Sequence, residues 1–129
     1  MKTAITCTAL MGLLLFALGF SVSAMRGRTQ QVGTTPQNPA DPLFKAIRAH
    51  GNTAEYAPML AILMLYLGAQ SPGAWILWTM AIVTACRYLI VLGIVLSPTL
   101  DRPQPLRFIG ALGTYLGGLA LSVAALIGA

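Results

Sequence analysis

The sequence predicts an all-α membrane protein, a bundle of four transmembrane helices that forms one domain over residues 1–129. The chain is 57% hydrophobic and 9% charged, whereas a soluble domain is about 25% charged. Four apolar segments are each long enough to cross a hydrocarbon core of about 30 Å. Backbone polar groups inside lipid must be satisfied within their own segment, so we expect helices.

The first expected helix covers residues 3–25. Lys2, the apolar stretch and the V-S-A run ending at Ala24 also resemble a secretory signal peptide. However, the stretch is long for a signal sequence, and Arg26 and Arg28 follow it as a stop-transfer flank. We therefore expect a retained helix, with cleavage after residue 24 as the alternative.

The other three helices are expected over residues 44–69, 74–97 and 106–128. Residues 26–43 are polar and rich in Pro and Gly, and Asp41 before Pro42 is typical of a helix start. The run Q-S-P-G at 70–73 is a short hairpin turn, and the prolines of residues 97–105 separate the last two helices.

Charge placement predicts the topology. Arg26, Arg28, Lys45 and Arg48 surround the first connection, and Arg102 and Arg107 surround the third. Because basic residues favour the cytoplasmic side, we expect both connections in the cytoplasm and both termini outside, in a bacterial inner (cell) membrane. The net charge of +5 is explained by this rule. Nothing resembles a nucleic-acid motif, so we expect no nucleic-acid partner.

A polar cluster interrupts the second helix. Arg48, Asn52, Glu55 and Tyr56 are spaced so that they share one side of the helix, whereas His50 and Thr53 lie off it. A charge inside a bilayer costs roughly 2.5–3.5 kcal/mol and usually marks a functional site. Glu55 lies about 20 Å along the helix, too deep to reach water, and needs a partner.

The third helix offers Arg87, its only charge, at a similar depth. We expect an ion pair between Glu55 and Arg87, within one chain or across a subunit boundary. One interpretation is a buried polar network that sets helix packing. The other is a site for a small zwitterion, whose carboxylates bind the arginines and whose amine binds Glu55. Cys7 and Cys86 lie in apolar runs, which excludes a disulfide scaffold and a zinc site.

The run R-A-H-G-N-T-A-E-Y at 48–56, followed by Pro58, resembles the helix-two signature of the MAPEG family (membrane-associated proteins in eicosanoid and glutathione metabolism). The similarity covers roughly residues 42–110, and the fourth helix agrees in placement only. The resemblance implies a homotrimer that binds glutathione between neighbouring subunits on the cytosolic side. Arg48, Asn52, Glu55, Tyr56 and Arg87 match the residues that contact glutathione.

The resemblance also implies that an arginine near the cytosolic surface lowers the pKa of the thiol, so that the thiolate attacks a lipophilic electrophile. Arg28 and Arg102 are the candidates for this catalytic role. His50 lies within the motif and joins the expected glutathione-binding residues. Its alternative role is that of a polar residue at the cytosolic interface.

One departure from the family pattern leaves other functions open. Where relatives carry His or Tyr after the helix-three arginine, this chain has Ile90, Val91 and Ile94. A non-catalytic binding or scaffold protein on the same fold is therefore the main alternative to a transferase or peroxidase. A small multidrug transporter is disfavoured because neighbouring arginines would repel a cationic substrate from Glu55.

Overall fold

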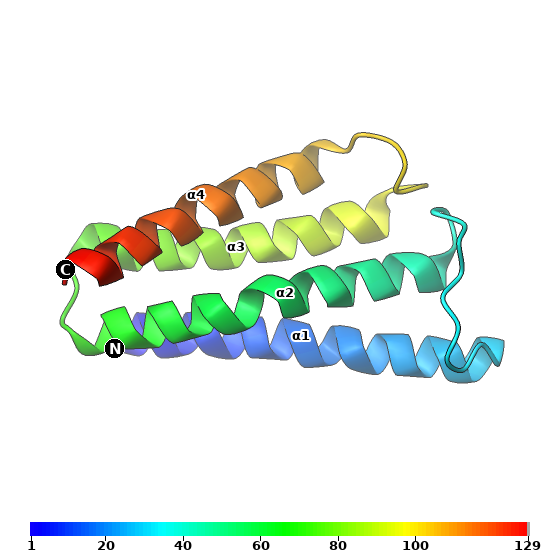
Figure 1. The fold of residues 1–129 in the computed structure, drawn as a ribbon, viewed down its shortest axis with the longest axis horizontal. Coiled ribbons are helices and arrows are strands. Elements are labelled where there is room, and N and C mark those ends of the chain that lie inside the picture. Colours follow the sequence, from blue (N-terminus) through cyan, green and yellow to red (C-terminus); the bar gives the residue numbers. More distant parts are fainter. Residues whose placement is uncertain (129) are drawn as a thin grey trace.

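A computed structural model describes residues 1–128, which form four α-helices. The helices run antiparallel to their chain neighbours. Both chain ends and the α2–α3 turn lie at one end of the bundle, and the two longer connections lie at the other (Figure 1). The predicted helices are confirmed to within a few residues, and the largest difference is that the first continues through Arg26 and Arg28. Their bounds are α1 (Lys2–Thr29), α2 (Pro42–Ala69), α3 (Ala74–Leu96) and α4 (Pro105–Ile127).

Hydropathy separates one helix from the others. Among residues 1–128, α1, α3 and α4 are long and apolar enough to cross a membrane by length and composition. The helix α2 falls short because its first turns carry the polar cluster, although it has the same length as α1. It continues through Pro58 without a break.

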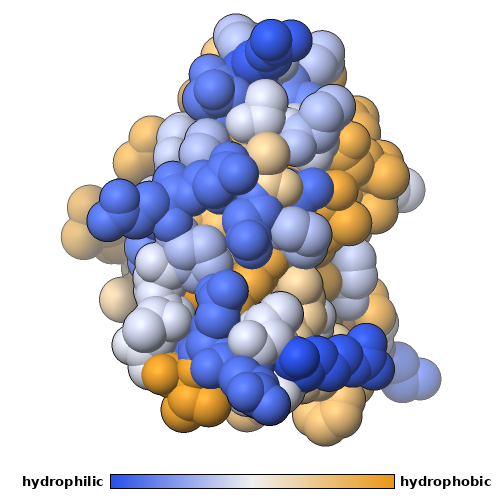
Figure 2. Space-filling view, turned by 90° about the vertical axis from the view of Figure 1, so that its right-hand side faces the viewer, coloured by the Kyte–Doolittle hydropathy of each residue, from blue (hydrophilic) through white to orange (hydrophobic). Residues whose placement is uncertain are grey.

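The apolar side chains face both inward and outward. Met11, Met64, Leu67 and Met80 are fully buried in the core. The outer surface is also apolar, because a large set of long side chains is exposed on all four helices, among them Phe16, Phe20, Trp78 and Leu126. At the end with the longer connections, hydrophilic residues cover most of the face and hydrophobic ones lie at its sides (Figure 2). This is the distribution expected where lipid surrounds the bundle and water meets its end.

Glycines bring α4 close to α3. A Cβ built on Gly110 would lie 2.7 Å from the backbone oxygen of Cys86 and 2.9 Å from the backbone nitrogen of Ile90. Gly113 and Gly117 similarly face Cys86 and Val83. The close approach that glycine permits is therefore used within the chain, between α3 and α4.

Polar contacts join the two longer connections. Lys45 Nζ donates a hydrogen bond of 3.1 Å to the backbone oxygen of Ser97, which links the start of α2 to the end of α3. The Leu100 amide donates to the Pro39 carbonyl at 3.1 Å. Both connections are thus held together at the end where α2 and α4 begin.

We expect Asp41→Ala to lower the free energy of unfolding by about 1 kcal/mol, because an N-cap carboxylate satisfies free amides of the first turn. Asp41 Oδ1 accepts from the Leu43 and Phe44 amides at 2.7 and 3.2 Å. Thermal unfolding in detergent, followed by circular dichroism, measures the change. Asp101→Ala is the control, since Asp101 is exposed and accepts only from the side chain of Thr99. Equal melting temperatures for the two variants would contradict the capping role.

Candidate functional site

Arg87 on α3 is the centre of the candidate site. Its side chain is 1% exposed, although it carries a charge in the middle of the bundle. Nη2 donates to the backbone oxygen of Asn52 at 2.9 Å and to its Oδ1 at 2.7 Å. Cζ lies 5.2 Å from the centre of the Tyr56 ring, within the range of a cation–π contact. The remaining donors, Nε and Nη1, are buried and have no hydrogen-bond partner among the residues that the structure describes.

A cavity of about 160 Å³ adjoins this guanidinium on the side of the longer connections. Within residues 1–128, three arginines and no acidic residue line it. Its wall comes from α2, α3, α4 and the α3–α4 connection, and consists of Arg48, Asn52, Arg87, Ile90, Ile94, Leu100, Arg107, Ala111 and Tyr115. Such a set of donors favours an anion, because a carboxylate or phosphate can satisfy the unpaired N–H groups of a buried arginine.

The predicted ion pair between Glu55 and Arg87 within one chain is wrong. Arg87 directs its hydrogen bonds to Asn52, and Glu55 is exposed. The reason is helical geometry: three residues after Asn52, Glu55 is turned by about 60° around α2. That rotation takes its carboxylate out of the α2–α3 contact and toward α4. The predicted link between α2 and α3 exists, but an amide makes it.

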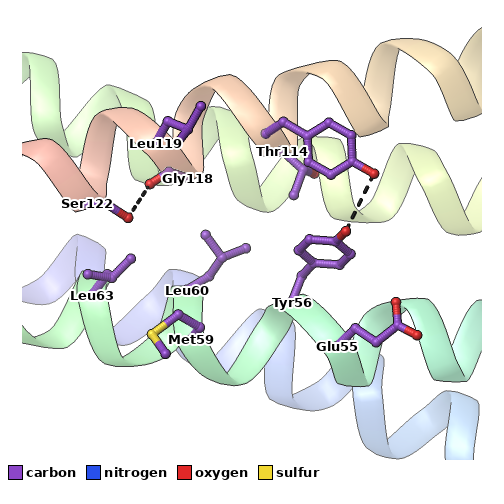
Figure 3. A pocket seen from close by; sticks show the side chains of 10 residues that line it. Glu55, Tyr56, Met59, Leu60, Leu63, Thr114, Gly118, Leu119 and Ser122 are labelled. Atoms are coloured by element: carbon purple, nitrogen blue, oxygen red, sulfur yellow. Dashed lines mark hydrogen bonds between the residues drawn. The ribbon is translucent and has the colours of Figure 1, made fainter.

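Tyr56 and Tyr115 lie between the arginine cavity and a second, larger groove. Their ring centres are 5.7 Å apart and their hydroxyl oxygens 3.5 Å apart. On one side lies the arginine cavity, which Tyr115 lines. On the other side, a groove of about 520 Å³ runs between α2 and α4, and both tyrosines line it (Figure 3). Glu55 lies at the tyrosine end of this groove.

Sequence reasoning missed Arg107 and Tyr115 as site residues. In the sequence Arg107 indicates only topology, yet it lines the cavity, and its Nη1 donates to the Leu100 carbonyl at 3.1 Å. One signal was available: Arg107 begins the helix that follows Arg87, so the antiparallel pair α3–α4 places both on the same half of the bundle. Tyr115 had no such signal, because its position depends on the rotation of α4.

Several predicted residues lie away from the cavity. His50 packs against α1, where a Cβ on Gly19 would meet its Nε2 at 3.2 Å. Arg28 and Arg102 are exposed and do not line the cavity, although the Arg102 carbonyl accepts from Arg107 Nη1 at 3.4 Å. Tyr88, which follows Arg87 in the sequence and is not one of the predicted site residues, donates to the Leu10 carbonyl at 2.8 Å, toward α1. Their functional roles remain predictions.

Comparison with known protein families identifies the family of this chain. The model of the MAPEG family matches residues 4–127. The chain belongs to the MAPEG family. No curated protein and no solved structure matches it.

The match extends beyond the motif on α2. It starts near the beginning of α1, so the MAPEG domain includes the first helix, which favours a retained span over a cleaved signal peptide. It also includes α4, for which the sequence showed agreement in placement only. As a MAPEG protein with apolar helices of spanning length, the chain is an integral membrane protein.

Proposed function

We propose that this MAPEG protein is a glutathione transferase-like enzyme of the membrane, which binds glutathione at its cytoplasmic end and conjugates or reduces lipophilic electrophiles. One observation carries the proposal: among residues 1–128, a buried arginine has two unpaired nitrogen donors, Nε and Nη1, beside a cavity that two further arginines and no acid line. A buried unpaired donor costs about 1–3 kcal/mol or more, and a bound carboxylate would remove that cost.

The size of the cavity indicates how much of glutathione it holds. The cavity of about 160 Å³ beside the buried guanidinium would hold one carboxyl-bearing end of the tripeptide. The rest would lie outside, past Tyr56 and Tyr115. Glu55, exposed on that side, suits the ligand amine. One chain would enclose only part of the ligand, and this supports our proposal that neighbouring subunits of a homotrimer complete the site.

Glutathione would supply the thiolate nucleophile, and the protein would supply orientation and positive charge. Arg28 and Arg102 remain candidates for the cation beside the thiolate. Arg107 joins them, because it lines the cavity. The basic residues at this end of the bundle favour a cytoplasmic orientation in a bacterial inner membrane, where glutathione is available.

A second function, binding without catalysis, has its own supporting observation. Ile90 and Ile94 line the cavity where relatives often carry His or Tyr. No hydroxyl or imidazole from α3 would then reach the ligand, since Tyr88 is turned toward α1. Glutathione would bind, but its thiol would stay protonated at neutral pH.

We expect Arg48→Ala and Glu55→Gln each to abolish glutathione binding without unfolding the bundle. The first removes a donor that faces the ligand carboxylate, and the second removes the negative charge that would pair with the ligand amine. Isothermal titration in detergent measures binding, and ultraviolet absorbance of the thiolate distinguishes catalysis from binding alone. Thiolate at neutral pH favours the enzyme, and binding without thiolate favours the alternative. If wild-type protein does not bind glutathione, or both variants bind normally, the assigned site is wrong.

A further inference from the structure

A further groove, of about 570 Å³, runs between α1 and α3. It shares no lining residue with the arginine cavity or with the groove between α2 and α4. Leu10 lines it from α1, and Ala81 and Ala85 line it from α3. Leu10 is 40% exposed, so this α1–α3 groove is open on the outer surface of the bundle. Tyr88 closes one end, because its hydroxyl bridges to the Leu10 carbonyl at 2.8 Å.

The other end of the α1–α3 groove is polar and positively charged. Lys2 and Thr3 line it. Among residues 1–128, no acidic side chain lies at this end, since Asp41 and Asp101 belong to the longer connections at the opposite end and Glu55 to the middle of α2. Both α1 and α3 begin here (Figure 1), and the positive ends of their dipoles add to the charge of Lys2. An anionic group is therefore favoured at this end of the groove.

The length of the groove matches one leaflet of a bilayer. Lys2 and Leu10 lie about 12 Å apart along α1, and half of a hydrocarbon core is about 15 Å. Trp78 is 70% exposed and lines an adjoining hollow with Thr3 and Ala81. An exposed tryptophan is typical of the boundary between lipid and water. The charged end thus lies at the depth of the lipid headgroups, and the Tyr88 end lies near the centre of the bilayer.

We propose that the α1–α3 groove binds one anionic phospholipid from the leaflet at the end of the bundle where the chain termini lie. Its phosphate would pair with Lys2 and accept a hydrogen bond from Thr3. One acyl chain would lie along Leu10, Ala81 and Ala85. A headgroup that is negative overall is favoured, because a zwitterionic headgroup brings its own ammonium to compete with Lys2. This proposal does not rest on glutathione binding.

Photo-cross-linking tests the groove directly. Phosphatidylglycerol with a diazirine at the end of one acyl chain is added to the protein in detergent, and labelled residues are identified by mass spectrometry. We expect saturable labelling near Leu10, Ala85 and Tyr88. Half competition should need about fivefold less unlabelled phosphatidylglycerol than phosphatidylcholine, the scale of one lysine at a lipid surface. Labelling spread evenly over the exposed helix faces would overturn the proposal.

Two variants separate the headgroup from the acyl chain. Lys2→Met should make the two lipids compete equally, whereas Lys2→Arg, the matched control, should keep the preference for phosphatidylglycerol. Ala85→Leu fills the groove, because Ala85 is exposed and lines it, and should abolish saturable labelling. Ala17→Leu is its control, since Ala17 is exposed on α1 and does not line the groove. All three positions are exposed, so we expect melting temperatures close to that of the wild type.

The outcomes also separate this proposal from its competitors. A wild-type lipid preference in Lys2→Met would show that the headgroup contact is wrong. If wild type gives no groove labelling and Ala85→Leu changes the oligomeric state, a second copy of the chain covers the groove, and the proposal is refuted. Phospholipid labelling without glutathione binding would retain this groove and refute the proposed function, whereas the reverse result would refute only the phospholipid site.

Discussion

Arg87→Met is expected to abolish glutathione binding while the bundle stays folded. The variant removes the buried guanidinium whose Nε and Nη1 have no partner, and with it the strongest donors for a ligand carboxylate. A buried charge that is poorly paired contributes little to stability, and replacing such groups by apolar ones of similar volume is often neutral or stabilising. We therefore expect binding to fall at least about 100-fold, the scale of two lost charge-assisted bonds. Titration calorimetry and thermal unfolding in the same detergent measure the two effects.

Matched variants make the result specific to the arginine fork. Arg87→Lys keeps the charge but offers a point donor instead of a planar fork, so binding should still weaken at least about tenfold. Arg26→Met removes an arginine from the same end of the bundle, in the last turn of α1, and should bind like wild type. Wild-type affinity in Arg87→Met would show that the arginine cavity is not the ligand site. A variant that unfolds would show that Arg87 holds α3 to α2.

Gly110→Ala is expected to give the largest loss of stability from a single methyl group. The added Cβ would lie 2.7 Å from the Cys86 carbonyl oxygen and 2.9 Å from the Ile90 amide nitrogen. Both neighbours are backbone atoms, which cannot rotate away, so α3 and α4 must separate. Overpacking of this kind costs about 1–3 kcal/mol and occasionally more, and we expect the upper end of that range.

The same glycine-to-alanine substitution at an uncrowded position should leave the stability unchanged or raise it. At Gly12 on α1 no atom lies within 4 Å of a new Cβ, and alanine is a better helix former than glycine by up to about 1 kcal/mol. We therefore expect Gly12→Ala to be neutral or stabilising in the same thermal unfolding experiment. Similar melting temperatures for Gly110→Ala and Gly12→Ala would contradict the close approach of α3 and α4.

The helices could be predicted because apolar runs and helix-ending residues such as Pro and Gly determine helix boundaries within a short stretch of sequence. Pro42 after Asp41, the turn at 70–73 and the prolines before α4 mark boundaries that a single sequence displays. The first helix is longer than predicted, because Arg26 and Arg28 do not end it. In the structure they lie within its last turn, where basic residues face the negative end of the helix dipole.

Residue spacing within one helix predicts which side chains of α2 lie on the same face, and the role of these residues as a ligand site stays a prediction. The spacing of Arg48 and Asn52 placed both on the wall of the arginine cavity, as the structure shows. Depth alone could not choose the partner of Arg87, because Asn52 and Glu55 lie within one turn of each other. The rotation of α2 against α3 made that choice in favour of the amide. The polar residues of α2 therefore lie at two places. Arg48 and Asn52 line the arginine cavity, and Glu55 lines the groove between α2 and α4.

The sequence by itself determined the membrane class, the four helices, the basic end of the bundle and the motif that marks the family. These properties depend on composition, periodicity and spacing within one segment. Only the tertiary structure decided that Arg107 lines the cavity, that Tyr115 separates it from an apolar groove, and that Glu55 faces away from Arg87. Each of these features depends on how one helix is rotated against another. That rotation is set by the packing of the α4 glycines on α3 and by the other helix contacts in the bundle.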